Sequence, residues 1–180
     1  MKATGIVRRI DDLGRVVIPK EIRRTMRIRE GDPLEIFTDR DGEVIFKKYS
    51  PIGELLSFAS QYAETLYKTS GIPIVIADRD TVVAYAGNSK KDCADKKISH
   101  EVEEIMESRQ LYTFDGNVSK SVIDGNEKLG ICACMPILSE GDIIGAVVST
   151  FSDDETRSPD DTEIKLIQTA AAFLSKQLES

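Results

Sequence analysis

The 180-residue sequence has no tryptophan, one histidine and three cysteines, and only 6% of its residues are aromatic. It has no run near the roughly 18 uninterrupted apolar residues of a membrane span, and its first residues include no apolar segment typical of a signal peptide. Three cysteines without a secretory signal argue against a disulfide framework. His100 alone leaves a zinc site short of ligands. We therefore expect a soluble cytoplasmic protein with no membrane contact, no metal and no cofactor.

Charge is plentiful but unevenly distributed. Charged residues make up 31% of the chain, and the formal net charge is -7. Residues 1–50 carry 12 Lys and Arg against 9 Asp and Glu, whereas residues 51–180 carry 12 against 22. Within the first 29 residues there are nine basic side chains and three acidic ones. This pattern indicates an electropositive module followed by an acidic one.

The first module, residues 1–50, has the pattern of four short strands and one short helix. Strands are expected at residues 2–10, 15–18, 33–38 and 43–48, with Asp41-Gly42 as a hairpin turn and a helix from Pro19 to about Ile28. The β-branched run at residues 16–18 leaves both faces of its strand apolar. A unit of this size buries little surface and has no metal or disulfide. We therefore expect two copies to form an intertwined homodimer.

The rest of the chain predicts a connecting helix and a larger domain. Apolar spacing favours a helix over residues 52–69, within a connector assigned to residues 51–70. Residues 71–180 combine strand-like runs with a helix bearing Val102, Ile105 and Met106 and a final helix over residues 159–178. Strand-like runs are expected at residues 72–77, 81–86, 111–114, 118–123, 129–138 and 143–151. The chain therefore predicts an α+β sandwich of sheet and helices in this region.

The most informative run is VRRIDDLGRVVIPKEIRR, which spans residues 7–24. It gathers arginines around one turn and one helix, namely Arg8, Arg9, Arg15, Arg23 and Arg24. The planar guanidinium group can bond bidentately to phosphate or to a guanine edge, so the run suits a DNA-binding surface. Charge alone leaves open an ordinary solvated face on a small domain.

The same run resembles the swapped-hairpin DNA-binding domain of AbrB-type transition-state regulators. The shared pattern is GIVRxxDxLGRVVIPxEIRRT followed by GDxLEI, and the match covers about residues 1–48. The resemblance implies that two chains exchange hairpins to form one interleaved β-barrel, which binds double-stranded DNA of varied sequence. The residues it implies at the duplex are Arg8, Arg15, Arg23 and Arg24, with Lys2 and Arg9 as weaker candidates.

The second domain is similar to GAF domains, a ligand-sensing α+β fold. The similarity rests on its hairpin, its helix in mid-chain and the segment MPILSEGDIIGAVV at residues 135–148, which contains PxxxxGxxIGAV. The two domains together resemble a family of transcriptional regulators of forespore genes in endospore-forming bacteria. The resemblance implies a nucleoid-associated activator or repressor of sporulation genes in the forespore. The GAF-like domains would serve for sensing an unidentified small molecule or for assembly into a homotetramer.

Two other functions stay open from the sequence. The swapped-hairpin fold also occurs in antitoxins, although these carry a short disordered tail where this chain has a patterned domain. The GAF fold includes thiol enzymes that reduce sulfoxides. Cys132 and Cys134 lie two apart on a strand and would share one face of it, where they are expected to be buried small apolar side chains. No set of Ser, His and Asp, phosphate loop or carboxylate pair stands out, so we do not expect an enzyme.

Overall fold

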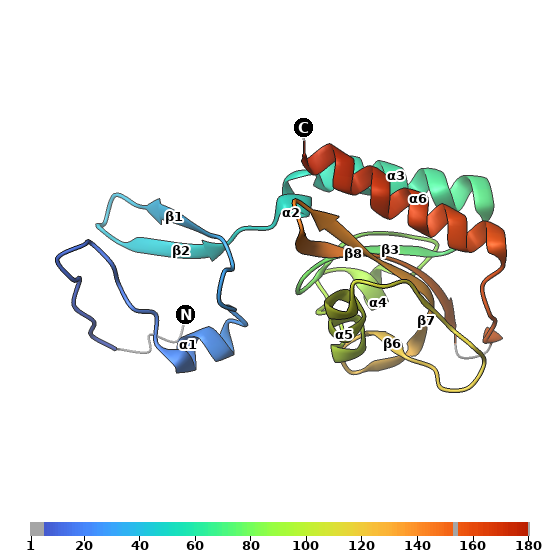
Figure 1. The fold of residues 1–180 in the computed structure, drawn as a ribbon, viewed down its shortest axis with the longest axis horizontal. Coiled ribbons are helices and arrows are strands. Elements are labelled where there is room, and N and C mark those ends of the chain that lie inside the picture. Colours follow the sequence, from blue (N-terminus) through green and yellow to red (C-terminus); the bar gives the residue numbers. More distant parts are fainter. Residues whose placement is uncertain (1–5, 153–154, 180) are drawn as a thin grey trace. The chain divides into compact units, whose positions relative to one another are not determined.

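The structure is a computed structural model that describes residues 6–152 and 155–179. The chain divides into two compact units, Met1–Tyr49 and Ser50–Ser180. Each unit has its own sheet, with two strands in the N-terminal unit and six in the C-terminal unit (Figure 1). The buried hydrophobic clusters of the described residues all lie in the C-terminal unit.

The N-terminal unit contains helix α1 (Lys20–Thr25) and an antiparallel hairpin of β1 (Leu34–Thr38) and β2 (Val44–Lys48). Ile36 lies opposite Phe46 in this hairpin. Gly42 closes the turn with a φ of 84°, a backbone conformation that favours glycine. Asp39 Oδ1 accepts hydrogen bonds from two backbone N–H groups of the same turn. The predicted hairpin is confirmed, but the two-residue turn predicted at Asp41-Gly42 is wrong, because residues 39–43 connect the paired Thr38 and Val44.

The other two strands predicted for this unit are not strands in the single chain. Residues 6–10 and 15–18 form no strand ladder, and residues 2–5 lie outside the described part of the chain. Their apolar side chains stay exposed: Val7 is 90% exposed, Ile10 68% and Val17 71%. A strand needs a neighbouring strand for its backbone N–H and C=O groups, and none of the described strands pairs with these segments. The two segments therefore have strand-like composition without forming strands among the residues that the structure describes.

The C-terminal unit is built on an antiparallel sheet with the strand order β4-β3-β8-β7-β5, and β6 also pairs with β7. The central strands β7 and β8 form a long hairpin. It turns at Glu140 and Gly141, both with positive φ. The strands are β3 (Ile74–Asp78), β4 (Val82–Ala86), β5 (Tyr112–Thr113), β6 (Ser121–Ile123), β7 (Asn126–Ser139) and β8 (Asp142–Ser152).

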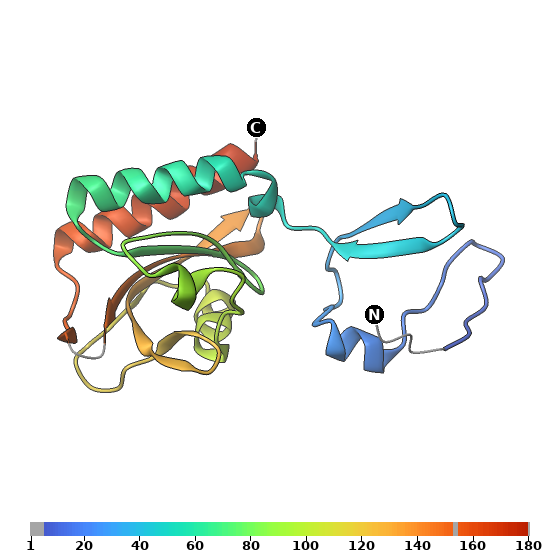
Figure 2. The same cartoon turned by 180° about the vertical axis from the view of Figure 1, so that it is seen from behind.

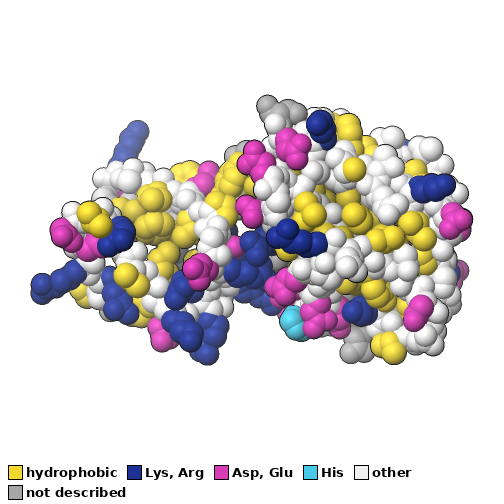
Figure 3. Space-filling view, in the orientation of Figure 1, with side chains coloured by type: hydrophobic (Ala, Val, Ile, Leu, Met, Phe, Trp, Pro, Cys, Tyr) yellow, Lys and Arg dark blue, Asp and Glu magenta, His cyan; other side chains and the backbone are white. Residues whose placement is uncertain are grey.

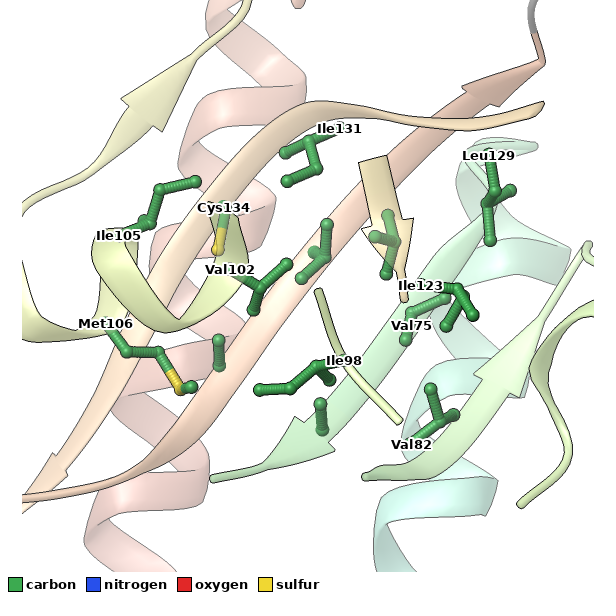
Figure 4. Close-up of a cluster of buried hydrophobic side chains, with 14 of the residues drawn as sticks. Val75, Val82, Ile98, Val102, Ile105, Met106, Ile123, Leu129, Ile131 and Cys134 are labelled. Carbon is green, nitrogen blue, oxygen red and sulfur yellow. The ribbon is translucent and has the colours of Figure 1, made fainter. Parts of the chain in front are cut away.

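Helices cover both faces of this sheet (Figure 2). One face carries α2 (Pro51–Glu54), α3 (Leu56–Ser70) and α6 (Asp161–Leu178), and the other carries α4 (Lys90–Cys93) and α5 (His100–Ser108). Alternate residues of β3 enter the two cores: Ile74 and Ile76 pack toward α3 and α6, and Val75 packs toward α5. Figure 4 shows the second core, where Val102, Ile105 and Met106 of α5 lie against the sheet. No described helix is long and apolar enough to span a membrane.

The predicted connecting helix is instead part of the C-terminal unit. It is broken at Leu55, whose ψ of 18° departs from helical geometry, and so forms α2 and α3. Ile52 is fully buried, as are Ala59 and Ala63 of α3. A Cβ built on Gly145 of β8 would lie only 2.7 Å from Ile52 Cδ1. Close packing in the core therefore holds this segment, and the boundary between the units falls before Ser50.

A buried ion pair fastens the start of α6. Glu163 is 2% exposed, and both its carboxylate oxygens accept hydrogen bonds from the Arg157 guanidinium, with 3.2 Å between Nη2 and Oε1. Asp160 caps the helix by accepting a hydrogen bond from Glu163 N. The paired guanidinium offsets the cost of removing the Glu163 carboxylate from water.

Candidate nucleic-acid interface

The predicted DNA-contacting arginines lie on two short segments of the N-terminal unit. Arg8 and Arg9 precede the turn at residues 11–14, and Arg15 follows it. Arg23 and Arg24 occupy the last turn of α1. All five side chains are exposed, and Lys2 lies outside the described residues. Figure 3 shows Lys and Arg side chains of this unit interleaved with exposed apolar ones.

The turn before Arg15 is ordered by Asp11. Its Oδ1 accepts hydrogen bonds from the backbone N–H groups of Leu13 and Arg15, and its Oδ2 accepts one from Arg15 Nε at 2.8 Å. These bonds, led by the one from the Arg15 backbone, hold the pKa of the Asp11 carboxyl below its usual value. Because the folded pKa is the lower one, this stabilisation is present above the unfolded pKa and is lost in acid. At neutral pH the turn holds Arg15 in place.

Helix α1 presents Arg23 and Arg24 at its carboxyl end, where cationic side chains suit the helix dipole. Pro19 is the N-cap residue, with a ψ of 146°, and not the first helical residue as predicted. The helix ends at Thr25, before the predicted Ile28, because Arg27 adopts a φ of 52°. Ile28 N then donates a hydrogen bond to Arg23 O at 2.7 Å, which closes the helix end. Sequence reasoning missed this turn because it contains neither glycine nor asparagine.

The cysteines of the C-terminal unit are buried and free. Cys132 is an extra residue in β7, between the pairs Ile131–Thr150 and Ala133–Ser149. Because of this bulge Cys132 does not share the core of Cys134: it packs with Phe114 and Phe151, and Cys134 packs in the α5 core. The predicted burial is confirmed, but the predicted common face is wrong.

Burial makes these thiols poor nucleophiles. It raises the pKa of Cys132 to about 12, with a further contribution from the neighbouring Glu163 carboxylate, and raises that of Cys134 to about 12. Burial and Asp92 raise the pKa of Cys93 to about 11. Among the described residues, no group of three or more His, Cys, Asp or Glu side chains could hold a metal ion. The thiolate that a cysteine enzyme needs is therefore strongly disfavoured at all three positions.

We expect the folded protein to resist thiol reagents. At about pH 8, where an exposed cysteine reacts readily, an aromatic disulfide reagent should label the native chain far more slowly than the urea-unfolded chain. A Ser57→Cys variant places a thiol on the exposed side of α3 and should gain one rapidly reacting group. Rapid labelling of the native wild-type chain would contradict the prediction and favour a thiol enzyme.

Comparisons with known proteins match both units. Residues 54–179 match the family described as stage V sporulation protein T C-terminal, transcription factor, and residues 7–53 match the family described as antidote-toxin recognition MazE, bacterial antitoxin. The chain is 55% identical over 180 residues to stage V sporulation protein T of Bacillus subtilis, covering 99% of each chain.

Solved structures are similar to each unit separately. The N-terminal DNA recognition domain of Bacillus subtilis AbrB is 63% identical and matches 28% of this chain and 94% of its own, with a TM-score of 0.26. The GAF domain of an Acinetobacter phosphoenolpyruvate-protein phosphotransferase has a TM-score of 0.53 at 9% identity, covering 73% of this chain and 84% of that one. The predicted fold class is confirmed: α+β, with an AbrB-type domain followed by a GAF-like domain.

Proposed function

The chain belongs to the family of stage V sporulation protein T, a transcription factor, and we propose that it regulates sporulation genes as a symmetric oligomer bound to duplex DNA. The observation that carries this proposal is the exposed arginine set on an electropositive unit whose relatives include a DNA recognition domain. We assign the DNA contacts to Arg8, Arg15, Arg23 and Arg24, with Arg9 and Lys2 in supporting roles. The cytoplasm, and within it the nucleoid of the forespore, is the proposed location.

Electrostatics give this surface its affinity. Arginines on the Asp11 turn and at the end of α1 would neutralise phosphates, and the acidic second unit would oppose nonspecific adhesion. Two-fold symmetry would present the set twice, so paired half-sites are expected. The test is equilibrium binding to a promoter-length duplex across a salt series. Log K should fall by about 0.9 per log unit of salt for each phosphate neutralised. Weak binding that ignores salt would refute the proposal.

Dimerisation through the N-terminal unit is supported by its uncovered apolar surface. The hairpin exposes apolar side chains on both faces, since Ile36 is 64% exposed and its neighbour Phe37 is 41% exposed. The extended segments add Val7 and Val17. A second copy that inserts its own hairpin would cover these side chains and offer the extended segments a neighbouring strand, which none of the described strands of this chain provides.

Further assembly is supported by an aromatic cluster on α3 and α6. The rings of Phe58, Tyr62 and Phe173 lie together, with 5.2 Å between the centroids of Tyr62 and Phe173. Phe173 is still 38% exposed and Leu56 50% exposed, so the outer side of this helix pair is partly apolar. We infer that this surface joins two dimers into a tetramer.

The assembly proposal predicts the effect of Phe173→Glu. A charge in this cluster should reduce the mass measured by light scattering from four chains to two, because the partner surface would have to desolvate it. The matched control is Gln168→Glu, which adds the same charge at an exposed position of the same helix and should leave the mass unchanged. An unaltered mass in the Phe173 variant would place the interface elsewhere.

Binding is proposed to be the chain's activity in place of catalysis. The buried high-pKa thiols argue against a thiol enzyme. The folded unit Ser50–Ser180 stands where an antitoxin would carry its short toxin-binding tail. The GAF-like unit would then serve for assembly or for sensing.

A further inference from the structure

Lys48, the last residue of β2, is hydrogen-bonded to the turn that ends α1. Lys48 Nζ donates a hydrogen bond to Arg27 O at 2.9 Å and lies 3.8 Å from Asp32 Oδ2. The Asp32 carboxylate, whose side chain is 4% exposed, also accepts a hydrogen bond from Arg29 N. The neighbouring Lys47 has its Nζ over the Phe37 ring, at 4.7 Å from the centroid. Two adjacent lysines of one strand therefore have different partners.

The bond from Lys48 holds a turn that is unfavourable by itself. Arg27 has a φ of 52°, which a residue with a Cβ rarely adopts unless the surroundings impose it. The same turn directs Ile28 N to Arg23 O and Met26 N to Ile22 O. Since Arg23 and its neighbour Arg24 form the last turn of α1, the direction of their side chains depends on how this helix end is held.

The chain then enters the C-terminal unit within two residues. Tyr49 N donates a hydrogen bond to Pro33 O inside the N-terminal unit. Ser50, next in sequence, donates its Oγ hydrogen to Asp78 Oδ2 at 2.9 Å and accepts a hydrogen bond from Gly53 N as the cap of α2. Tyr49 is thus hydrogen-bonded within the N-terminal unit, and the next residue, Ser50, is hydrogen-bonded within the C-terminal unit.

We propose that Lys48 is a positioning residue for DNA binding, through which the C-terminal unit sets the orientation of α1. The proposal rests on the DNA-binding function proposed above. Lys48 fixes the carboxyl end of α1, and the Ser50–Asp78 bond fixes the same stretch of chain to the β3–β4 turn of the C-terminal unit. A change in the C-terminal unit that moves Ser50 would displace Lys48, which is two residues away. The hydrogen bond from Lys48 to Arg27 O would then shift the end of α1 and change the direction of Arg23 and Arg24.

The first test compares Lys48→Met with Lys47→Met in the full-length protein. Each variant removes one positive charge from adjacent positions of β2, so a purely electrostatic role predicts equal losses of affinity and equal salt slopes. A positioning role predicts that Lys48→Met weakens binding about tenfold more than Lys47→Met, while the two variants still have equal salt slopes. Lys48→Arg, which keeps a donor and the charge, should restore most of the affinity.

Amide hydrogen exchange supplies a readout independent of DNA. Lys48→Met should speed exchange at Ile28, whose N–H closes the helix end, without changing exchange in β1 and β2. If Lys48→Met unfolds the unit, exchange rises throughout the hairpin, and the Lys48→Arg variant then decides: affinity lost with a folded hairpin and a native Ile28 amide overturns the proposal. Equal affinity in the two methionine variants overturns it as well.

A double-mutant cycle tests the link to the C-terminal unit. Ser50→Ala removes the bond to Asp78 and should weaken DNA binding several-fold in the wild-type background but have little further effect in Lys48→Met. Ser57→Ala, at an exposed position of α3, is the matched control and should have no effect in either background. Additive losses from Ser50 and Lys48 would overturn the link. Wild-type protein that does not bind DNA would instead refute the function itself.

Discussion

Replacing Arg23 and Arg24 together by alanine should weaken DNA binding by at least about 30-fold at moderate salt, because each well-placed arginine contributes roughly 1–3 kcal/mol. Both side chains are exposed at the carboxyl end of α1. The substitution leaves buried packing intact, and alanine is a good helix former, so the fold should persist. If both arginines neutralise phosphates, the salt slope should flatten by about two. Fluorescence anisotropy across a salt series measures both quantities.

The matched control for this pair is Lys90→Ala with Lys91→Ala. Both lysines are exposed on α4 of the C-terminal unit, and their removal changes the net charge equally. This control should lower affinity only slightly, through the long-range field. Equal effects of the two double variants would show that total charge, and no particular surface, governs binding. The assignment of Arg23 and Arg24 would then be wrong.

Replacing Arg157 by methionine should destabilise the C-terminal unit by about 3 kcal/mol, the lower end of the cost of removing one partner of a buried pair. Arg157 is itself 41% exposed, which places the effect at that end, but Glu163 is 2% exposed and would lose its bidentate partner. Urea unfolding followed by circular dichroism should show a lower midpoint with an unchanged slope.

The double variant Arg157→Met with Glu163→Met separates the lost charge from lost packing. Once the carboxylate is gone no buried charge is left uncompensated, so most of the stability should return. If the double variant is as unstable as the single one, the Arg157 side chain acts through packing. DNA affinity in the folded range should be the same for all three proteins, because this pair lies far in sequence from the arginine set and wholly within the C-terminal unit.

Regular elements that form within one chain were predictable from the sequence. The apolar run at residues 72–77 is buried on both faces in β3, and the three-four spacing after residue 159 is the buried side of α6. These signals work because the partner elements are local or lie in the same core. The exposure of the arginines at residues 8–24 was predictable from the run of charge, whereas their contact with DNA stays a prediction.

Features that depend on tertiary contacts were not predictable in this way. Periodicity gives residues 52–69 as one amphipathic helix, but it cannot tell whether the apolar side faces a neighbouring core or another chain. The strands expected at residues 2–10 and 15–18 are not formed over the described residues 6–10 and 15–18, because composition cannot tell whether a strand will find a neighbour to pair with. The bulge at Cys132 contains no glycine that would indicate it in the sequence. The hydrogen bond from Lys48 to Arg27 joins positions 21 residues apart, so no local pattern predicts it.

The seating of Ile52 beneath Gly145 decides where this chain can be cut. A fragment that begins at Leu56 would leave an isoleucine-sized hole in the core, and any side chain larger than hydrogen at position 145 would also meet Ala77 O at 2.1 Å. A fragment that begins at Ser50 keeps the buried Ile52 and also Ser50, the N-cap residue of α2. A fragment of the second unit should therefore begin at Ser50, four residues before the family match to that unit begins.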